Sequence, residues 1–152
     1  MDELDVKILQ FLQEDGRTPF TKIAKNTGVS ESTIRSRYAT LIEKGVVHTV
    51  SIVDPFVLGF EAPAIIGVSV DIGNIDKVAK AIVAFPEVSY LVMVLGNYDI
   101  IVEVFCHDIS HLVDLITNGF PSVPGIRETE TLVIGKSYKL SYRWSPRLDD
   151  LQ

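Results

Sequence analysis

Apolar residues recur at helical spacing in the first 45 residues and predict three helices there. The first follows Asp2, a favourable N-cap, and its apolar stripe comprises Leu4, Ile8, Phe11 and Leu12. A second, short helix is expected to open at Thr18 and Pro19 and to end at Gly28. The third should run from Ser30 to Gly45. A short helix, a glycine-containing turn and a longer capped helix are typical of the helix-turn-helix motif.

The third predicted helix has one apolar face, with Ile34, Tyr38 and Leu41, and an opposite face of small and polar residues. Such a face can approach base edges in the major groove. The predicted DNA contacts are Thr18, Ser30, Ser32, Thr33, Arg35, Ser36, Arg37, Thr40 and His48. Arg37 lies near the core edge, where a structural ion pair is an equally good interpretation. For the whole segment, the alternative is a plain three-helix bundle with a solvated polar face.

The residues after these helices predict a β-ribbon and then a hinge. The ribbon would be "VVHTVSIVD", residues 46–54, and would form a wing, although simple strand packing explains the same pattern. "DPFVLGFEA", residues 54–62, contains Pro55 and Gly59 and has no clear periodicity. We therefore expect a winged helix-turn-helix domain at 1–53, a linker at 54–62 and a second domain at 63–152.

The second domain alternates strands and helices in the order βαββαβ, with Asn74 and Asp108 as expected helix caps. This order predicts an α+β, ferredoxin-like fold, in which two helices cover one face of an antiparallel sheet. The two middle strands are apolar on both faces, which favours a partner subunit on the second face. The last segment, "KSYKLSYRWSP", places Tyr138, Leu140, Tyr142 and Trp144 on one side, a predicted aromatic docking face.

Charge is uneven along this 152-residue chain of net charge −6. Residues 54–152 hold 7 basic against 13 acidic side chains, whereas residues 1–53 hold 7 of each. Within residues 17–44 the acidic side chains are only Glu31 and Glu43, and the basic ones are Arg17, Lys22, Lys25, Arg35, Arg37 and Lys44. A local positive surface is therefore expected on an acidic protein.

The N-terminal residues, the lengths of the apolar runs and the single cysteine bear on the location of the protein and on its redox chemistry. The acidic, amphipathic start is unlike a secretory signal, and no apolar run reaches the length that spans a bilayer. We expect a cytoplasmic protein without membrane contact. The single cysteine, Cys106, ends an apolar run and is expected to pack in the core.

The chain resembles the Lrp/AsnC (feast/famine) transcriptional regulators over essentially its full length. Six segments carry the resemblance: "LDVKILQFLQEDGR", "IAKNTGVSESTIRSRYATLIEKGVV", "DPFVLGF", "FPEV", "GNYD" and "VPGIRETETLV". The resemblance implies a DNA-binding homodimer, often assembled into octamers, whose βαββαβ domain binds an amino acid in many members. The sequence shows no phosphate-cradling glycine loop and no nucleophile elbow, so we expect no cofactor and no enzymatic activity. Two features depart from the family pattern: Pro19 stands where Ser is common, and Ala39 and Thr40 stand where basic residues are frequent.

The turn "GNYD" raises a chemical question, because it separates two apolar strands. An amino acid needs donors for its carboxylate and an acceptor for its ammonium, and an open glycine turn with an aspartate offers both. The resemblance implies an effector site at Gly96, Asn97, Tyr98, Asp99, Thr129 and Thr131. The alternative is an ordinary hairpin, in which Gly96 and Asn97 supply positive φ angles and Asp99 caps its own turn.

Other chemistry has weaker support. Cys106, His107, Asp108 and His111 form the densest cluster of potential metal ligands, but capping and solvation are the commoner roles there, so no metal is predicted. Two alternative functions stay open: a tetrapyrrole enzyme subunit like siroheme decarboxylase, which resembles this family in fold, and an effector-binding dimer without DNA function.

Overall fold

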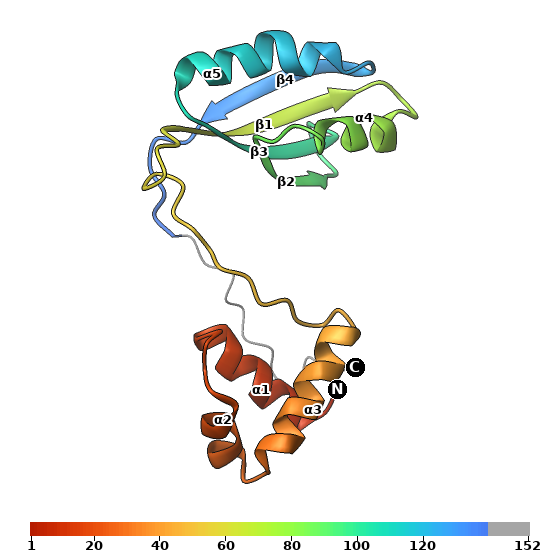
Figure 1. The fold of residues 1–152 in the computed structure, drawn as a ribbon. Coiled ribbons are helices and arrows are strands. Elements are labelled where there is room, and N and C mark those ends of the chain that lie inside the picture. The colour runs from red at the N-terminus through yellow and green to blue at the C-terminus, as the bar shows by residue number, and fades with distance from the viewer. Residues whose placement is uncertain (140–152) are drawn as a thin grey trace. The chain divides into compact units, whose positions relative to one another are not determined.

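The computed structural model describes residues 1–139. The chain folds into two compact units, one built on Met1–Ile52 and the other on Val53–Tyr138 (Figure 1). Within the described residues, no helix is long and apolar enough to cross a membrane.

The first unit consists of the helices α1 (Glu3–Glu14), α2 (Phe20–Thr27) and α3 (Glu31–Glu43). Their shared core contains Ile8, Leu9, Ile23, Ala24, Ile34 and Leu41. Local capping sets two of the helix starts. Asp2 and Asp5 form a reciprocal capping box on α1, and the Ser30 hydroxyl accepts from the Thr33 N–H on α3. Gly28 ends α2 with a left-handed φ of 75°, as the sequence predicts.

The predicted ribbon at residues 46–54 is absent, because residues 47–54 form no strand. Val50 and Ile52 are 75% and 59% exposed. The start of the segment contacts the helices: Val47 packs against their core, and the hydroxyls of Tyr38 and Thr49 lie 2.9 Å apart. A two-stranded ribbon needs a second strand, and no other segment of the described chain pairs with this one. Within residues 1–139, this segment therefore does not form the predicted wing.

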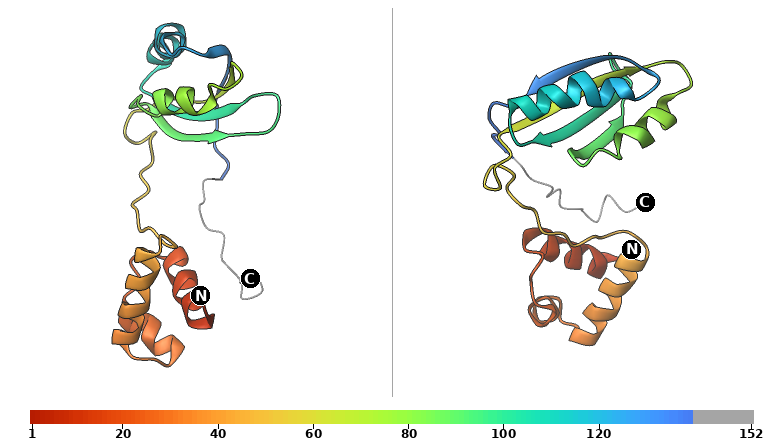
Figure 2. Two further views of the ribbon diagram at one scale, coloured as in Figure 1. Left: turned by 90° about the vertical axis from the view of Figure 1, so that its right-hand side faces the viewer. Right: turned by 45° about the horizontal axis from the view of Figure 1, so that its top comes forward.

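The second unit has the predicted βαββαβ order. Its elements are β1 (Ala62–Val70), α4 (Ile75–Ile82), β2 (Val88–Met93), β3 (Ile100–Cys106), α5 (Ile109–Asp114) and β4 (Ile126–Val133). A π-helical turn, Leu115–Gly119, and a short 3-10 helix, Phe120–Ser122, extend α5. The strands are antiparallel in the order β2-β3-β1-β4, and α4 and α5 lie on the same side of the sheet (Figure 2). This confirms the α+β, ferredoxin-like prediction.

The two faces of the sheet differ in how well they are covered. On the helix-bearing face, Ile66 of β1 lies between Val102 and Thr131, and both Ile66 and Val102 are fully buried. On the opposite face, the alternate residues of the central strand β3 are only half-buried, and Leu132 and Tyr90 on the outer strands are each 57% exposed. Apolar side chains thus reach solvent on the face without helices.

Cys106 ends β3 inside the core and is a free cysteine. Burial raises the pKa of its thiol to about 11, so the thiol stays protonated at neutral pH. This confirms the packing role expected for Cys106.

The predicted aromatic stripe begins at Tyr138, which is 88% exposed. Its other members, Leu140, Tyr142 and Trp144, lie outside the described residues, so the stripe stays a prediction.

Candidate nucleic-acid interface and effector turn

The outward face of α3 is the candidate nucleic-acid interface. Ile34 and Leu41 are buried against α1 and α2, and this packing turns the opposite side of the helix to solvent. The exposed residues on that side are Ser32, Ser36, Ala39, Thr40 and Glu43, as the sequence predicts. Short side chains leave the helix backbone accessible, which a close approach to base edges requires.

Hydroxyl groups cluster at the start of this helix. The Ser30 Oγ lies 2.7 Å from the Ser32 Oγ and 2.8 Å from the Thr33 Oγ1. It also accepts from the Thr33 N–H at 3.1 Å. Ser30 therefore has a capping role, while Ser32 keeps an exposed side chain.

Arg37 forms a structural ion pair. Its Nη1 lies 2.7 Å from Asp2 Oδ2 and 3.3 Å from Asp5 Oδ1, and these contacts join α3 to the start of α1. The hydrogen bond to Asp2 raises the pKa of the Arg37 guanidinium. The contacts favour the structural interpretation of Arg37 over a DNA contact.

Thr18 differs from the other predicted DNA contacts in being buried. Its side chain is buried, and its hydroxyl donates to the Phe11 carbonyl at 3.4 Å. It does not cap α2, whose N-cap position is Pro19. A buried hydroxyl with an internal acceptor is poorly placed to reach DNA, so the structure does not favour Thr18 as a contact.

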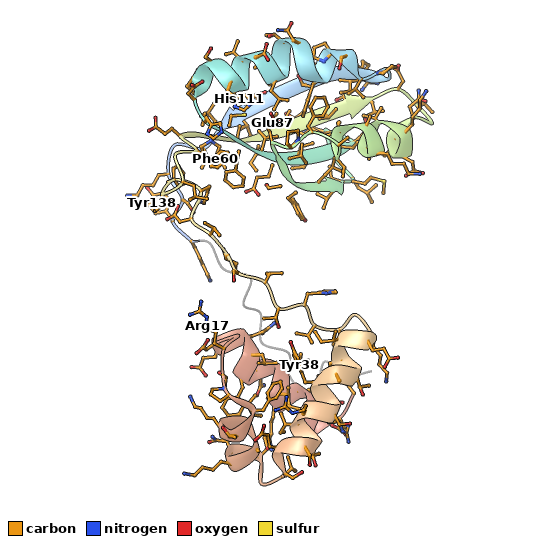
Figure 3. The ribbon with its side chains drawn as sticks, in the orientation of Figure 1. Arg17, Tyr38, Phe60, Glu87, His111 and Tyr138 are labelled. Carbon is orange, nitrogen blue, oxygen red and sulfur yellow. The ribbon has the colours of Figure 1, made fainter. Side chains whose placement is uncertain are left out.

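An open cleft of about 260 Å³ lies beside α2. It is lined by Leu12, Gly16, Arg17, Thr18, Pro19, Phe20 and Tyr38. Figure 3 labels two of these side chains, Arg17 and Tyr38. Arg17 is exposed at this cleft but is absent from the predicted DNA contacts. The sequence signal that would have added Arg17 to the predicted contacts is its place among the basic residues of positions 17–44. His48 is also exposed, on the segment that forms no strand.

The turn "GNYD" is anchored to β1 by its aspartate. The Asp99 Oδ2 accepts from the Val70 N–H at 2.7 Å, and the Asp99 N–H donates to the Val68 carbonyl at 3.0 Å. Tyr98 lies over Gly67, where an added Cβ would come within 2.7 Å of the ring. Both contacts are structural and pack the turn against the central strand.

Two features of this turn differ from expectation. Neither Gly96 nor Asn97 has a positive φ, so this is not the tight hairpin of the structural alternative. Thr129 and Thr131 pair with Val68 and Ile66, on the helix-bearing face. The Tyr98 ring covers Gly67 on the opposite face, so one chain does not gather the six predicted effector residues around a single point.

The histidine cluster is internally paired. His107 stacks on Phe60 with ring centroids 4.4 Å apart, and its backbone N–H donates to His111 Nδ1 at 3.3 Å. His111 Nε2 lies 2.9 Å from Glu87 Oε1 (Figure 3). Both ring nitrogens of His111 are thus occupied, with Nε2 carrying the proton when the ring is neutral. No group of three or more His, Cys, Asp and Glu in residues 1–139 is placed to hold a metal.

Two family models match the sequence. The AsnC-type helix-turn-helix domain matches residues 1–42, and the Lrp/AsnC ligand binding domain matches residues 63–144. The chain is 36% identical over 143 residues to the HTH-type transcriptional regulator FL11 of Pyrococcus horikoshii, covering 91% of this chain and 92% of FL11.

Solved structures share the fold. E. coli AsnC has a TM-score of 0.87 at 27% identity, covering 96% of this chain and 99% of AsnC. A transcriptional regulator of Neisseria meningitidis, solved in complex with L-Met, has a TM-score of 0.87 at 24% identity and covers 100% of this chain and 99% of its own.

Replacing Asp99 with Ala should lower the free energy of unfolding of the second unit by about 1–3 kcal/mol, because the buried Val70 N–H loses its acceptor. Asp99→Asn is the matched control, since its amide oxygen can still accept, and it should lose distinctly less. Urea unfolding followed by circular dichroism measures both. An Asp99→Ala chain as stable as the parent would contradict the anchoring role.

Proposed function

The chain belongs to the Lrp/AsnC family of transcriptional regulators, and from that premise we propose that α3 is its DNA-reading helix. The observation that carries the proposal is the exposed, small and polar face of α3, held outward by the burial of Ile34 and Leu41. Ser32, Arg35, Ser36 and Thr40 are its base-side contacts. These residue types match the donors and acceptors of base edges in the major groove.

The remaining predicted residues take supporting roles in this proposal. Ser30 and Thr33 form the start of the reading helix, and Arg37 fixes its orientation through Asp2 and Asp5. Arg17, Lys22 and Lys25 supply positive charge for phosphates, and His48 lies on the segment that follows the helix. Together these residues concentrate positive charge in the first unit of an acidic chain.

Ser36→Glu should lower DNA affinity about tenfold or more, because it places a negative charge against phosphates and base edges. The thermal transition should stay close to the parent's, since Ser36 is exposed. Fragments enriched from genomic DNA by the parent serve as the probe. Ser137→Glu adds the same charge in the second unit and should bind normally. Equal affinity in the two variants would exclude this face of α3.

We also propose that the helix-free face of the sheet binds a second copy of the chain. Its support is the exposure of apolar side chains there, including Leu132 and Tyr90. Pairing of residues 47–54 with the same segment of the partner would supply the second strand that residues 1–139 of one chain do not provide. Further assembly, up to an octamer, would use the end of the sheet with the "GNYD" turn, where Ile72 is 100% and Leu95 is 96% exposed.

Leu132→Glu should convert the protein to monomers, because it places a charge in the proposed apolar contact between sheets. Leu95→Glu is the control: it introduces the same change at the turn and should leave dimers while removing larger assemblies. Sedimentation velocity separates these species. If Leu132→Glu sediments like the parent, the sheet face is not the subunit contact.

An amino acid is the proposed effector, bound between copies of the second domain. The proposal is supported by the match to a ligand binding domain and by the L-Met bound to the related fold from N. meningitidis. Gly96 and Asn97 are exposed and can offer backbone donors to a carboxylate. Tyr98 and Asp99 support this turn. Within one chain, Thr129 and Thr131 lie on the other face of the sheet from Tyr98, so the threonines of the site would come from a neighbouring copy.

Calorimetric titration with each of the twenty amino acids should find at least one that binds. Thr131→Val should weaken that binding by about tenfold, because a hydroxyl contact is lost while side-chain volume is kept. Thr117→Val is the control, since the Thr117 hydroxyl donates within its own helix to Val113. A parent that binds none of the twenty would end the amino-acid proposal.

The proposal includes no enzymatic activity, and it places the protein in the compartment that holds chromosomal DNA, the cytoplasm. The tetrapyrrole-enzyme alternative is not favoured, because the relatives are named transcriptional regulators and His111 is paired with Glu87. An effector-binding dimer without DNA function would be recognised if the parent enriched no genomic fragment at low salt.

A further inference from the structure

Arg35 lies on α3 and is exposed. Its side chain contacts one residue of α3 and one residue of α2. Its Nη2 lies 2.7 Å from the Oε1 of Glu31, one turn earlier on α3. Its guanidinium carbon also lies 5.4 Å from the ring centroid of Phe20, on α2. The guanidinium is therefore held in place although 67% of the side chain is exposed.

Phe20 is itself fixed by the packing of the helices. Its ring contacts the ring of Tyr38, with centroids 5.1 Å apart. The Tyr38 hydroxyl in turn lies 2.9 Å from the Thr49 hydroxyl. The surface under Arg35 is thus part of the α2–α3 contact and is present before any DNA is bound.

The negative charge of Glu31 is unfavourable close to DNA. A carboxylate near the phosphate backbone repels it, and an exposed ion pair on a helix contributes little to stability. An arginine that is already oriented, however, loses less side-chain freedom on forming a two-pronged hydrogen bond. Repulsion by Glu31 lowers affinity for every DNA sequence, and the oriented Arg35 strengthens binding only where the right base is present. Both effects increase the ratio of specific to non-specific affinity.

We propose that Glu31 and Phe20 are positioning residues that hold the Arg35 guanidinium for a bidentate contact with a guanine in the major groove. This inference rests on the proposed role of α3 in reading DNA. It assigns Glu31 and Phe20 to specificity rather than to affinity. The opposing possibility is that Arg35 contacts a phosphate, and Glu31 only subtracts from the positive charge of the surface.

The test compares affinity for two duplexes, one selected by the parent from randomised sequence and one unselected. Glu31→Gln should leave affinity for the unselected duplex equal or higher, because a negative charge is removed. The ratio of selected to unselected affinity should fall about tenfold, the order expected when one bidentate base contact is lost. Glu3→Gln removes the same charge from an equivalent i,i+4 ion pair, that of Glu3 with Lys7 on α1, and should leave the ratio unchanged.

Two further variants make the outcome specific. Phe20→Leu keeps an apolar side chain but removes the aromatic face, and it should lower the same ratio. Arg35→Lys removes the guanidinium fork, and adding Glu31→Gln to it should lower the ratio no further. Circular dichroism confirms that each variant is folded.

The possible failures can be told apart. If the parent enriches no sequence, the DNA-reading proposal for the whole unit fails. If the parent enriches a sequence but Glu31→Gln raises both affinities equally, Arg35 acts on phosphate and the positioning proposal alone is overturned. Loss of discrimination at positions other than a G·C pair would overturn it as well.

Discussion

The second unit can cover only one face of its sheet with its own helices, and much of the structure follows from that constraint. Most of the helix-free side of β1, one of the two central strands, is buried too, because it carries the small residues Pro63, Gly67 and Ser69 and receives the Tyr98 ring. The outer strands have no such cover and leave Leu132 and Tyr90 exposed. A partner subunit is the economical way to bury that apolar surface.

Helix positions could be predicted from the sequence because their causes are local. Asp2, Ser30 and Asp108 all occupy the cap positions expected of them. Each side chain accepts a hydrogen bond from the backbone N–H three residues later. The buried and exposed faces of α3 follow from helical periodicity alone. The role of Arg37 could not be decided in this way, because its partner Asp5 lies 32 residues away in the sequence.

The candidate sites show where local reasoning stops. The Asp99 carboxylate accepts from Val70, 29 positions earlier, and no turn rule includes that contact. Thr129 and Thr131 fall on the other face of the sheet from Tyr98, which depends on the pairing register of β1 and β4. The ribbon predicted at residues 46–54 has the right alternation but finds no second strand to pair with among residues 1–139. Each miss thus involves a partner that is distant in the sequence or belongs to another molecule.

The contact between Gly67 and Tyr98 limits which residues can occupy these two positions during evolution. A side chain at position 67 would occupy the space of the ring, with its Cβ only 2.7 Å from it. A lineage can therefore acquire a larger residue at 67 only after, or together with, a smaller one at 98. Among divergent members of the family, these two positions should covary, with a larger residue at 67 accompanied by a smaller one at 98.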